Sequence, residues 1–232
     1  MKTVALCLSG HVRDFEKASS NLFDNILLAN PNHKFHIFIS TWNIVNSKNS
    51  EVVRRGIPHE RLAYDNFNEI DCNKIVRTYN PLAMEVEFSR DAYFSKYLKY
   101  TGTPNNPISV FSQFYKVKKV LKMILDYPKY DVVIRSRFDL KLSKKILLDD
   151  FDFNKNIIYI EDEGYPRNWA SDKLAIMNFE SSIYYSNFYD NLEEYMIKLK
   201  TTVPEMMLAE YLNSSNISFS KEMKRIGTLA LF

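Results

Sequence analysis

Short apolar runs alternate along the chain with segments whose apolar residues recur at helical spacing. Residues 3–9 and 34–40 are predicted strands, because each carries an apolar run of strand length between polar residues. Residues 15–28, between these two runs, carry apolar side chains at helical intervals and predict a helix. A helix that joins two strands in this way favours parallel pairing. The chain is therefore predicted to open with a β-α-β unit.

The alternation continues after a less regular stretch from about residue 43 to residue 106. Residues 108–125 predict a helix, because their apolar spacing is helical and Pro107 suits a first turn. Acceptor-facing or lid elements are expected in the irregular stretch: helices over 69–79 and 89–100, a short strand over 84–88 and a loop over 46–50.

The composition indicates one globular domain. The chain has 232 residues, of which 46% are hydrophobic and 14% aromatic, and this suffices for a sizeable core. The longest apolar run is far shorter than the roughly 20 residues of a membrane span, and the first run is too short for a signal peptide. Cys7 and Cys72 have neither zinc-site nor disulfide-framework spacing. We therefore expect a cytoplasmic protein, with a peripheral position at the membrane as the alternative.

The charge balance, the glycine spacing and the absence of two catalytic motifs argue against several functional classes. The net charge of +3 comes from 31 basic and 28 acidic residues, a balance that requires neither nucleic acid nor a membrane as a partner. None of the five glycines has the spacing of a P-loop or of a dinucleotide fingerprint. The zinc-protease motif H-E-x-x-H and the hydrolase motif G-x-S-x-G are also absent from the sequence.

Residues 131–140 combine a strand with charged side chains at its end. The apolar run Val132–Ile134 leads directly into Arg135, Arg137 and Asp139. Arginine pairs with phosphate oxygens in bidentate fashion, and a carboxylate can hold a divalent cation. These residue types suit a ligand that carries a diphosphate. The alternative is an internal salt bridge or a solvated turn.

The ends of the first two predicted strands also carry polar residues: Ser9, Gly10, His11 and Arg13 after the first, and Thr41 and Trp42 after the second. In an open parallel sheet, ligands bind beyond the carboxyl ends of the strands. Gly10 would let the backbone approach a nucleotide, Arg13 could reach a phosphate, and Trp42 could stack on a base. The alternatives are a helix-capping role for His11 and a core position for Trp42.

Taken in order, these segments resemble a group of small bacterial and viral glycosyltransferases of GT-A type. The segments that carry the resemblance are 9–13, 38–42, 112–117, 130–140, 171–177 and 204–212. The resemblance implies a single α/β domain over residues 1–232, with a Rossmann-type, mostly parallel sheet flanked by helices. It further implies a nucleotide-binding half over 1–140, to which Gln113 also belongs, and an acceptor-side half with a C-terminal segment over 141–232.

The resemblance also implies a nucleotide-sugar donor held through Mn²⁺ or Mg²⁺ by a D-x-D-type element. In this sequence the element is Arg137-Phe138-Asp139, so Asp139 is the one carboxylate that corresponds to a metal or donor ligand. One carboxylate can suffice when phosphates supply other ligands, and this is the mode we expect. The alternative is a metal-independent mode in which Arg135 and Arg137 balance the charge of the diphosphate.

Transfer with inversion needs a carboxylate that takes the proton of the acceptor hydroxyl. Asp172 and Glu205 are the candidates for this role. Asp172 could instead end the preceding loop, and Glu205 could be a helix-start residue stabilised by the helix dipole. The acidic run 161–163 could contact sugar hydroxyls or be solvated.

The expected activity is sugar transfer from a nucleotide sugar to an acceptor hydroxyl, on a glycan or glycolipid precursor. Two other classes stay open: a base-glycosylating enzyme that acts on nucleic acid, and a non-catalytic nucleotide-binding module. Residues 217–232 mix basic and apolar side chains and could close over a diphosphate or dock on a protein or membrane surface.

Overall fold

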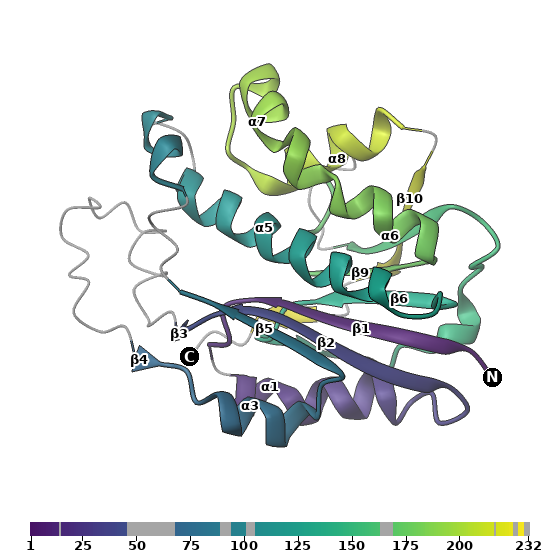
Figure 1. The fold of residues 1–232 in the computed structure, drawn as a ribbon. Coiled ribbons are helices and arrows are strands. Elements are labelled where there is room, and N and C mark those ends of the chain that lie inside the picture. The colour runs from purple at the N-terminus through teal and green to yellow at the C-terminus, as the bar shows by residue number, and fades with distance from the viewer. Residues whose placement is uncertain are drawn as a thin grey trace.

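A seven-stranded mixed sheet runs through the molecule (Figure 1). The computed structural model describes residues 1–13, 15–45, 68–88, 94–100, 105–162, 169–215, 217–224 and 227–229. The strands of the sheet, in chain order, are β1 (Thr3–Gly10), β2 (Lys34–Trp42), β5 (Ala83–Glu87), β6 (Val132–Ser136), β8 (Ile157–Asp162), β9 (Leu174–Met177) and β10 (Ser218–Lys224). Their spatial order is β10-β8-β9-β6-β1-β2-β5.

The sheet is mainly parallel. The pairs β1–β2, β1–β6, β2–β5 and β8–β10 are parallel, and only β9 runs antiparallel to its two neighbours. The predicted mostly parallel sheet in an α/β fold is therefore confirmed. The predicted β-α-β opening is confirmed too, since β1 pairs with β2 in parallel from Thr3↔Lys34 to Gly10↔Thr41.

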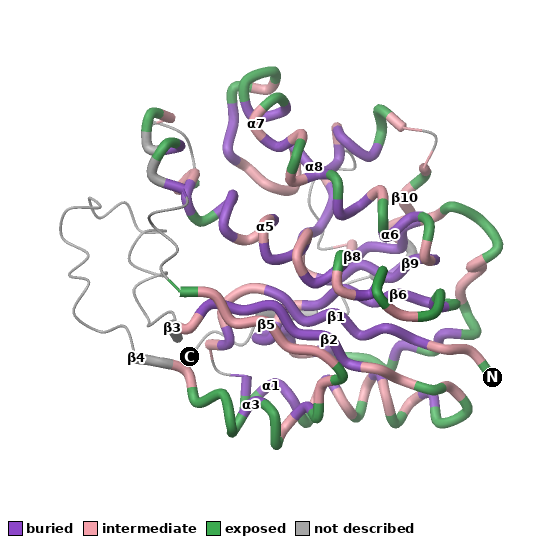
Figure 2. The backbone as a smooth tube through the Cα atoms, in the orientation of Figure 1, coloured by how far each residue is buried: buried purple, intermediate pink, exposed green. Residues whose placement is uncertain are grey.

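Helices cover both faces of this sheet, as Figure 1 shows. One face carries α5 (Pro107–Met123), α6 (Phe179–Ser186), α7 (Phe188–Leu199) and α8 (Pro204–Asn213). The other face carries α1 (Phe15–Leu22) and α3 (Cys72–Tyr79). A helix on each face buries the central strands from both sides, and Figure 2 shows β1 and β6 as buried.

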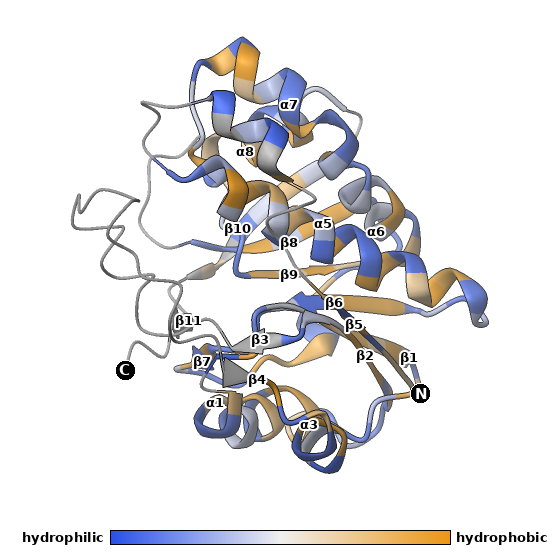
Figure 3. Ribbon diagram, turned by 60° about the vertical axis from the view of Figure 1, so that its left-hand side comes forward, coloured by the Kyte–Doolittle hydropathy of each residue, from blue (hydrophilic) through white to orange (hydrophobic). Residues whose placement is uncertain are grey.

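This two-sided burial explains the continuous apolar runs in the sequence. Along β1, Ala5 and Cys7 belong to the core beneath α5, whereas Val4, Leu6 and Leu8 belong to the core beneath α1. A strand covered on both faces needs apolar residues at every position, not at alternate ones. Figure 3 shows that β6 begins apolar and becomes polar toward its end.

Shorter elements complete the described chain. They are the π-helical turn η1 (Phe23–Leu27), the 3-10 helices η3 (Ser95–Lys99), η4 (Ile124–Asp126) and η5 (Leu148–Asp150), and the antiparallel pairs β3 (Ile44–Val45) with β4 (Asn68–Glu69) and β7 (Leu140–Leu142) with β11 (Gly227–Leu229). No helix in the described ranges combines the length and apolar character that a membrane crossing needs.

Several predicted boundaries shift. The helix expected over 15–28 is α-helical only to Leu22 and then widens into η1. The helix expected over 69–79 begins at Cys72, because the Asp71 side chain accepts a hydrogen bond from the Lys74 backbone N–H at 2.9 Å and caps it. The helix expected over 89–100 is described only from residue 94 onward and is a 3-10 helix there. The loop expected over 46–50 lies outside the described residues.

The order of the strands changes direction beside β1. From β1 the chain builds β2 and β5 on one side and then returns to place β6 on the other side of β1. In open α/β sheets generally, ligands bind beyond the carboxyl ends of the strands, where the direction of winding changes. In this sheet the change lies between β1 and β6.

A buried lysine ties α5 to the edge of the sheet at β5. Lys116 is fully buried, forms an ion pair with Glu87, and lies 4.1 Å from the centre of the Trp42 ring. Burial lowers the pKa of Lys116, although the Glu87 carboxylate acts in the opposite direction. The second carboxylate oxygen of Glu87 accepts a hydrogen bond from the Tyr115 hydroxyl at 2.8 Å.

Replacing Glu87 with glutamine should therefore destabilise the fold. The change leaves the Lys116 ammonium buried without a counter-charge, which costs about 3–5 kcal/mol in comparable cases. Urea unfolding measures the loss. Glu85→Gln, on the same strand, is the matched control, since Glu85 pairs with the more exposed Lys119 and its loss should cost less than about 1 kcal/mol. Equal losses in the two variants would contradict a special role for the buried pair.

Candidate functional site

The predicted site residues meet at the edge of the sheet formed by the carboxyl ends of β1 and β6. Leu8 of β1 is opposite Ser136 of β6, and Ser136 is opposite Leu174 of β9. Because β9 is antiparallel, its amino-terminal end points to this same edge and brings Asp172 with it. Two groups of side chains form here, one around Asp139 and one around Arg135.

The first group, the Asp139 cluster, consists of Arg13, Arg137 and Asp139. Arg137 donates from Nε and Nη2 to the two carboxylate oxygens of Asp139, each at 2.9 Å, and Arg13 donates from Nη1 to Oδ2 at 2.6 Å. The Asp139 residue is 2% exposed, whereas the Arg13 and Arg137 side chains are 26% and 14% exposed. One buried carboxylate thus holds two guanidinium groups at the edge of the sheet.

The two arginines change the acidity of this carboxyl group. Burial by itself would raise the pKa of Asp139, but the charges and hydrogen bonds of Arg137 and Arg13 outweigh it and hold the pKa well below its usual range. Asp139 is therefore ionised throughout the physiological range. The internal salt bridge left open by the sequence is present between Arg137 and Asp139.

The backbone after β1 adopts an unusual conformation to place Arg13. Gly10 has a φ of 105° and Arg13 a φ of 40°, both in the left-handed region. A Cβ at Gly10 would meet nothing within 4 Å, so glycine is favoured there by conformation and not by space. The Thr41 hydroxyl donates to the Gly10 carbonyl at 2.7 Å and fixes this turn. For Arg13 the conformation costs about 1–3 kcal/mol, which the ion pair with Asp139 offsets.

The second group, the Arg135 network, lies behind the first and is closed to solvent. Arg135 is 0% exposed, and its guanidinium donates to neutral oxygens: Nε to Ser9 Oγ at 3.2 Å and Nη1 to the Asp172 main-chain carbonyl. Nη2 is buried and has no hydrogen-bond partner among the described residues. Burial lowers the pKa of Arg135. The network therefore holds a buried cation whose charge is not neutralised by a direct ion pair with a described residue.

The Asp172 carboxylate belongs to the same network. The Gln113 side-chain amide, from α5, donates to Asp172 Oδ2, and Asp172 is only 4% exposed. The predicted donor residue Gln113 and the predicted catalytic residue Asp172 are thus brought together. Glu205 lies in the first turn of α8, and its main-chain carbonyl accepts a hydrogen bond from the Ala170 backbone N–H at 2.9 Å. This bond connects α8 to the loop that carries Asp172.

Trp42 and His11 occupy different surroundings. Trp42 is 1% exposed, and its ring lies nearly parallel to that of Tyr115, with ring centres 5.8 Å apart. Trp42 is therefore a core residue, which the sequence analysis gave as the alternative. Its predicted stacking on a base stays a prediction. His11 is partly exposed in the segment between Gly10 and Arg13.

Tyr185 lies near Arg135, and the sequence does not indicate it as a site residue. It comes from α6 and is 1% exposed, and its hydroxyl has no hydrogen-bond partner among the described residues. Burial raises the pKa of Tyr185 to about 12, while the nearby charge of Arg135 acts in the opposite direction. No local pattern distinguishes this tyrosine from other residues on the apolar stripe of its helix.

The described residues do not fit a resident Mn²⁺ or Mg²⁺ ion. Both oxygens of Asp139, the one predicted metal ligand, accept guanidinium hydrogen bonds. Across the described ranges, no three His, Cys, Asp or Glu side chains gather as metal ligands would. Of the acidic run 161–163, Glu161 and Asp162 end β8 and residue 163 lies outside the described chain.

The C-terminal segment returns to this edge of the sheet. β10 lies at the far side of the sheet, yet β11 pairs with β7, and Leu229 is opposite Leu140, the residue after Asp139. A closing role over a diphosphate stays a prediction, because residues 230–232 lie outside the described chain.

Asp139→Asn should lower the free energy of unfolding at pH 7 by on the order of 3 kcal/mol, since two arginine charges lose their common partner. A carboxyl whose pKa is depressed by folding stabilises the native state above the unfolded pKa of about 4 and loses that contribution at lower pH. The difference between wild type and Asp139→Asn should therefore shrink as the pH falls below about 4. Denaturant unfolding across pH 2–7 tests this, with the exposed Asp150→Asn as the control. A difference that stays constant with pH would contradict the ion-pair account.

Comparisons with known proteins assign no family to the chain. No family model matches it, and no curated protein matches it either. The resemblance to GT-A glycosyltransferases therefore stays an expectation from the sequence motifs. What the site does has to follow from its geometry and charge.

Proposed function

We propose that this protein is a glycosyltransferase that binds the diphosphate of a nucleotide-sugar donor at the Asp139 cluster. The observation that carries the proposal is a pair of partly exposed guanidinium groups, held by one buried carboxylate, at the point where the sheet changes its direction of winding. Guanidinium groups match phosphate oxygens in geometry and charge. Open α/β sheets bind ligands at this point of the fold.

The arginines would act on the leaving group. Breaking the bond between the sugar and the diphosphate leaves negative charge on the diphosphate oxygens, and preorganised cations stabilise that charge. Arg13 and Arg137 are preorganised by Asp139. In this proposal Arg13 and Arg137 stabilise the charge of the leaving diphosphate, and the buried Arg135 adds a further positive charge. This is the metal-independent mode that the sequence left open.

Asp172 would act as the general base. Its carboxylate lies at the same edge, and the Gln113 amide and the Arg135 guanidinium hold its side chain and its main chain. The base takes the proton of the acceptor hydroxyl, the hydroxyl oxygen bonds to the anomeric carbon, and the nucleoside diphosphate leaves with the electron pair of the broken bond. The acceptor belongs to a glycan or glycolipid precursor in this proposal. A cytoplasmic location fits the two free cysteines, Cys7 and Cys72.

A non-catalytic nucleotide-binding module is the second candidate. It is favoured by one observation, the engagement of both Asp139 oxygens by arginine where a D-x-D element would hold a metal. Both candidates bind a nucleotide, but only the first transfers a sugar. Measurements of binding and of turnover therefore separate them.

The binding test is calorimetric titration with nucleoside diphosphates and nucleotide sugars, in EDTA and with Mn²⁺ or Mg²⁺. Arg13→Gln and Arg137→Gln should each weaken binding about tenfold or more, since a charged hydrogen bond contributes about 1.5–3 kcal/mol. EDTA should leave the wild-type affinity unchanged. Arg77→Gln, which removes the same charge from an exposed position of α3, is the control. Arg137→Lys keeps the charge if Arg137→Gln fails to fold. No binding of any nucleotide to folded wild-type protein would overturn the proposal.

The catalytic test is the release of nucleoside diphosphate from the donor that binds. Asp172→Asn should lower the rate about 10²–10⁴-fold, the usual contribution of a general base, while the donor affinity stays within about twofold of wild type. Glu194→Gln, an exposed carboxylate on α7, should leave the rate unchanged. If wild type binds nucleotides but releases no product with any sugar acceptor, the non-catalytic module is the better account.

A further inference from the structure

Two buried polar atoms near the candidate base have no hydrogen-bond partner among the described residues. They are Nη2 of Arg135, from β6, and the hydroxyl oxygen of Tyr185, from α6. The two residues are 0% and 1% exposed, and α6 packs against β6 on the face of the sheet that α5 also covers (Figure 1). Both atoms therefore lie inside the protein, away from bulk solvent.

Arg135 and Tyr185 also interact electrostatically. Burial raises the pKa of Tyr185, and the charge of Arg135 acts in the opposite direction. Burial lowers the pKa of Arg135, and Tyr185 and Asp172 oppose that effect. A guanidinium group keeps its proton in proteins. A charged donor and a neutral hydroxyl group thus share this buried region.

The other two nitrogens of the Arg135 guanidinium are already fixed. Nε donates to Ser9 Oγ at 3.2 Å, and Nη1 donates to the Asp172 main-chain carbonyl. Because the guanidinium group is planar, these two bonds also fix the position of Nη2 and the directions of its N–H groups. A charged donor that stays buried and unpaired is costly. The folded protein should therefore provide an acceptor for Nη2.

Water is the partner that suits both buried atoms. Nη2 can only donate a hydrogen bond, whereas the Tyr185 hydroxyl can donate or accept one. A single water molecule accepts from Nη2 and bonds to the hydroxyl, and internal waters commonly serve buried polar groups of this kind. An anion would also accept from both groups, but the Asp172 carboxylate acts on Arg135 and Tyr185 as well and disfavours a second negative charge.

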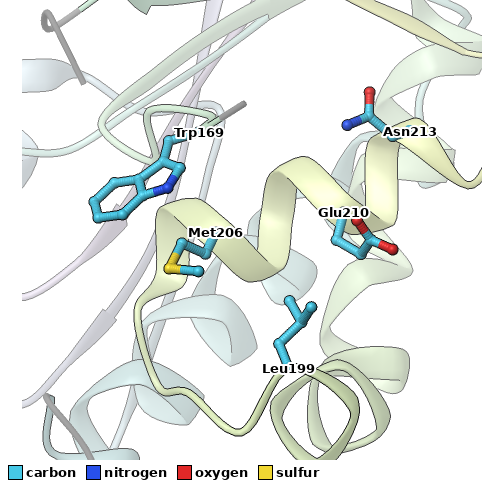
Figure 4. A pocket seen from close by; sticks show the side chains of 5 residues that line it. All are labelled: Trp169, Leu199, Met206, Glu210 and Asn213. Carbon is cyan, nitrogen blue, oxygen red and sulfur yellow. The ribbon is translucent and has the colours of Figure 1, made fainter. Parts of the chain in front are cut away.

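The segment that leads to Asp172 is anchored to α8. The Ala170 backbone N–H donates to the Glu205 carbonyl at 2.9 Å. Figure 4 shows Trp169, one residue earlier, close to Met206 at the start of α8, and these two side chains line one shallow hollow. These contacts hold the segment just before Asp172.

Asp172 itself is held by two side chains. The Arg135 guanidinium binds its main-chain carbonyl, and the Gln113 amide donates to its carboxylate. A shift of the guanidinium would therefore move the backbone that carries the carboxylate. A misplacement of about 1 Å can lower a reaction rate by about 10²-fold. What holds Nη2 thus bears on the position of the candidate base.

We infer that one internal water molecule binds between Arg135 Nη2 and the Tyr185 hydroxyl, and that Tyr185 acts through it as a positioning residue for Asp172. The water site is independent of the proposed function. The positioning role rests on that function, because it assumes that Asp172 is the general base. Tyr185 does not contact the donor or the acceptor in this account.

Crystal structures of the full-length protein, at a resolution that shows ordered water, test the site directly. Wild type should contain one water about 2.7–3.2 Å from both Arg135 Nη2 and the Tyr185 hydroxyl oxygen. Crystals grown with bromide in place of chloride distinguish water from a halide, since bromide gives an anomalous peak and water does not. An anomalous peak at this position, no water, or a direct bond between the two side chains would overturn the water site.

Tyr185→Phe removes the hydroxyl and keeps the ring, so the direction of its effect on stability is informative. If the hydroxyl holds a water on Arg135, the melting temperature should fall by about 2–4 °C, the shift expected for one lost hydrogen bond in a protein of this size. Removal of a hydroxyl that has no partner would leave the melting temperature unchanged or raise it, and this result would contradict the water site.

Tyr195→Phe, on α7, is the matched control. The Tyr195 hydroxyl shares a hydrogen bond of 2.7 Å with Ser214 Oγ, so the same substitution should lower the melting temperature to a similar extent. In the release of nucleoside diphosphate, Tyr185→Phe should lower kcat about tenfold with the donor affinity unchanged. Tyr195→Phe should keep the wild-type kcat. A comparison of the two variants therefore separates positioning from a general loss of stability.

The measurements fail in distinguishable ways. If both variants retain the wild-type kcat, or lose it equally, the positioning role falls and the water site is judged by the crystal structures and the melting temperatures alone. If the water is present and wild type releases no product from any donor, the water site stands, and the proposed function falls together with the positioning role.

Discussion

The contact of one buried carboxylate with two arginines is the constraint on which the candidate site depends. Arg13 and Arg137 come from segments more than a hundred residues apart, and their like charges repel one another unless Asp139 lies between them. The backbone is left-handed at Gly10 and Arg13, in the segment that leads from β1 to the contact of Arg13 with this carboxylate. Asp139 thus fixes the positions of two guanidinium groups, and the proposed binding of an anionic ligand depends on that arrangement.

Sheet topology supplies the rest of the arrangement. β6 pairs with β1 on the side opposite to β2, so the last residues of β6 lie beside the end of β1. In the main sheet β9 runs antiparallel to its neighbours, so its amino-terminal end, which follows Asp172, lies at the same edge. Arg135 then joins the ends of β1 and β9 through Ser9 and the Asp172 main chain. One buried side chain thus connects the ends of β1 and β9, where the proposed donor site and the candidate base lie.

The sequence predicts the strands and the main helix well, because the buried strands are continuous apolar runs and the buried face of the helix is a periodic apolar pattern. It cannot tell Arg135 from Arg137, since the two have the same chemistry two positions apart. Arg135 lies within β6 and is fully buried, with Tyr185 of α6 near it, whereas Arg137 follows the strand and its side chain is 14% exposed. In the same way, Trp42 is a core residue because Tyr115 and Lys116 of α5, together with Phe94, pack on it. The burial of Tyr185 depends on contacts between distant segments and leaves no local signal in the sequence.

The most direct measurement is a crystal structure of the protein with a nucleoside diphosphate bound in the presence of EDTA. The account predicts the diphosphate oxygens within hydrogen-bond distance of the Arg13 and Arg137 guanidinium groups, with the Asp139 pairing retained and Arg135 still buried. A nucleotide bound elsewhere would contradict it. So would a diphosphate that binds only when a divalent ion bridges it to Asp139, with the arginines displaced.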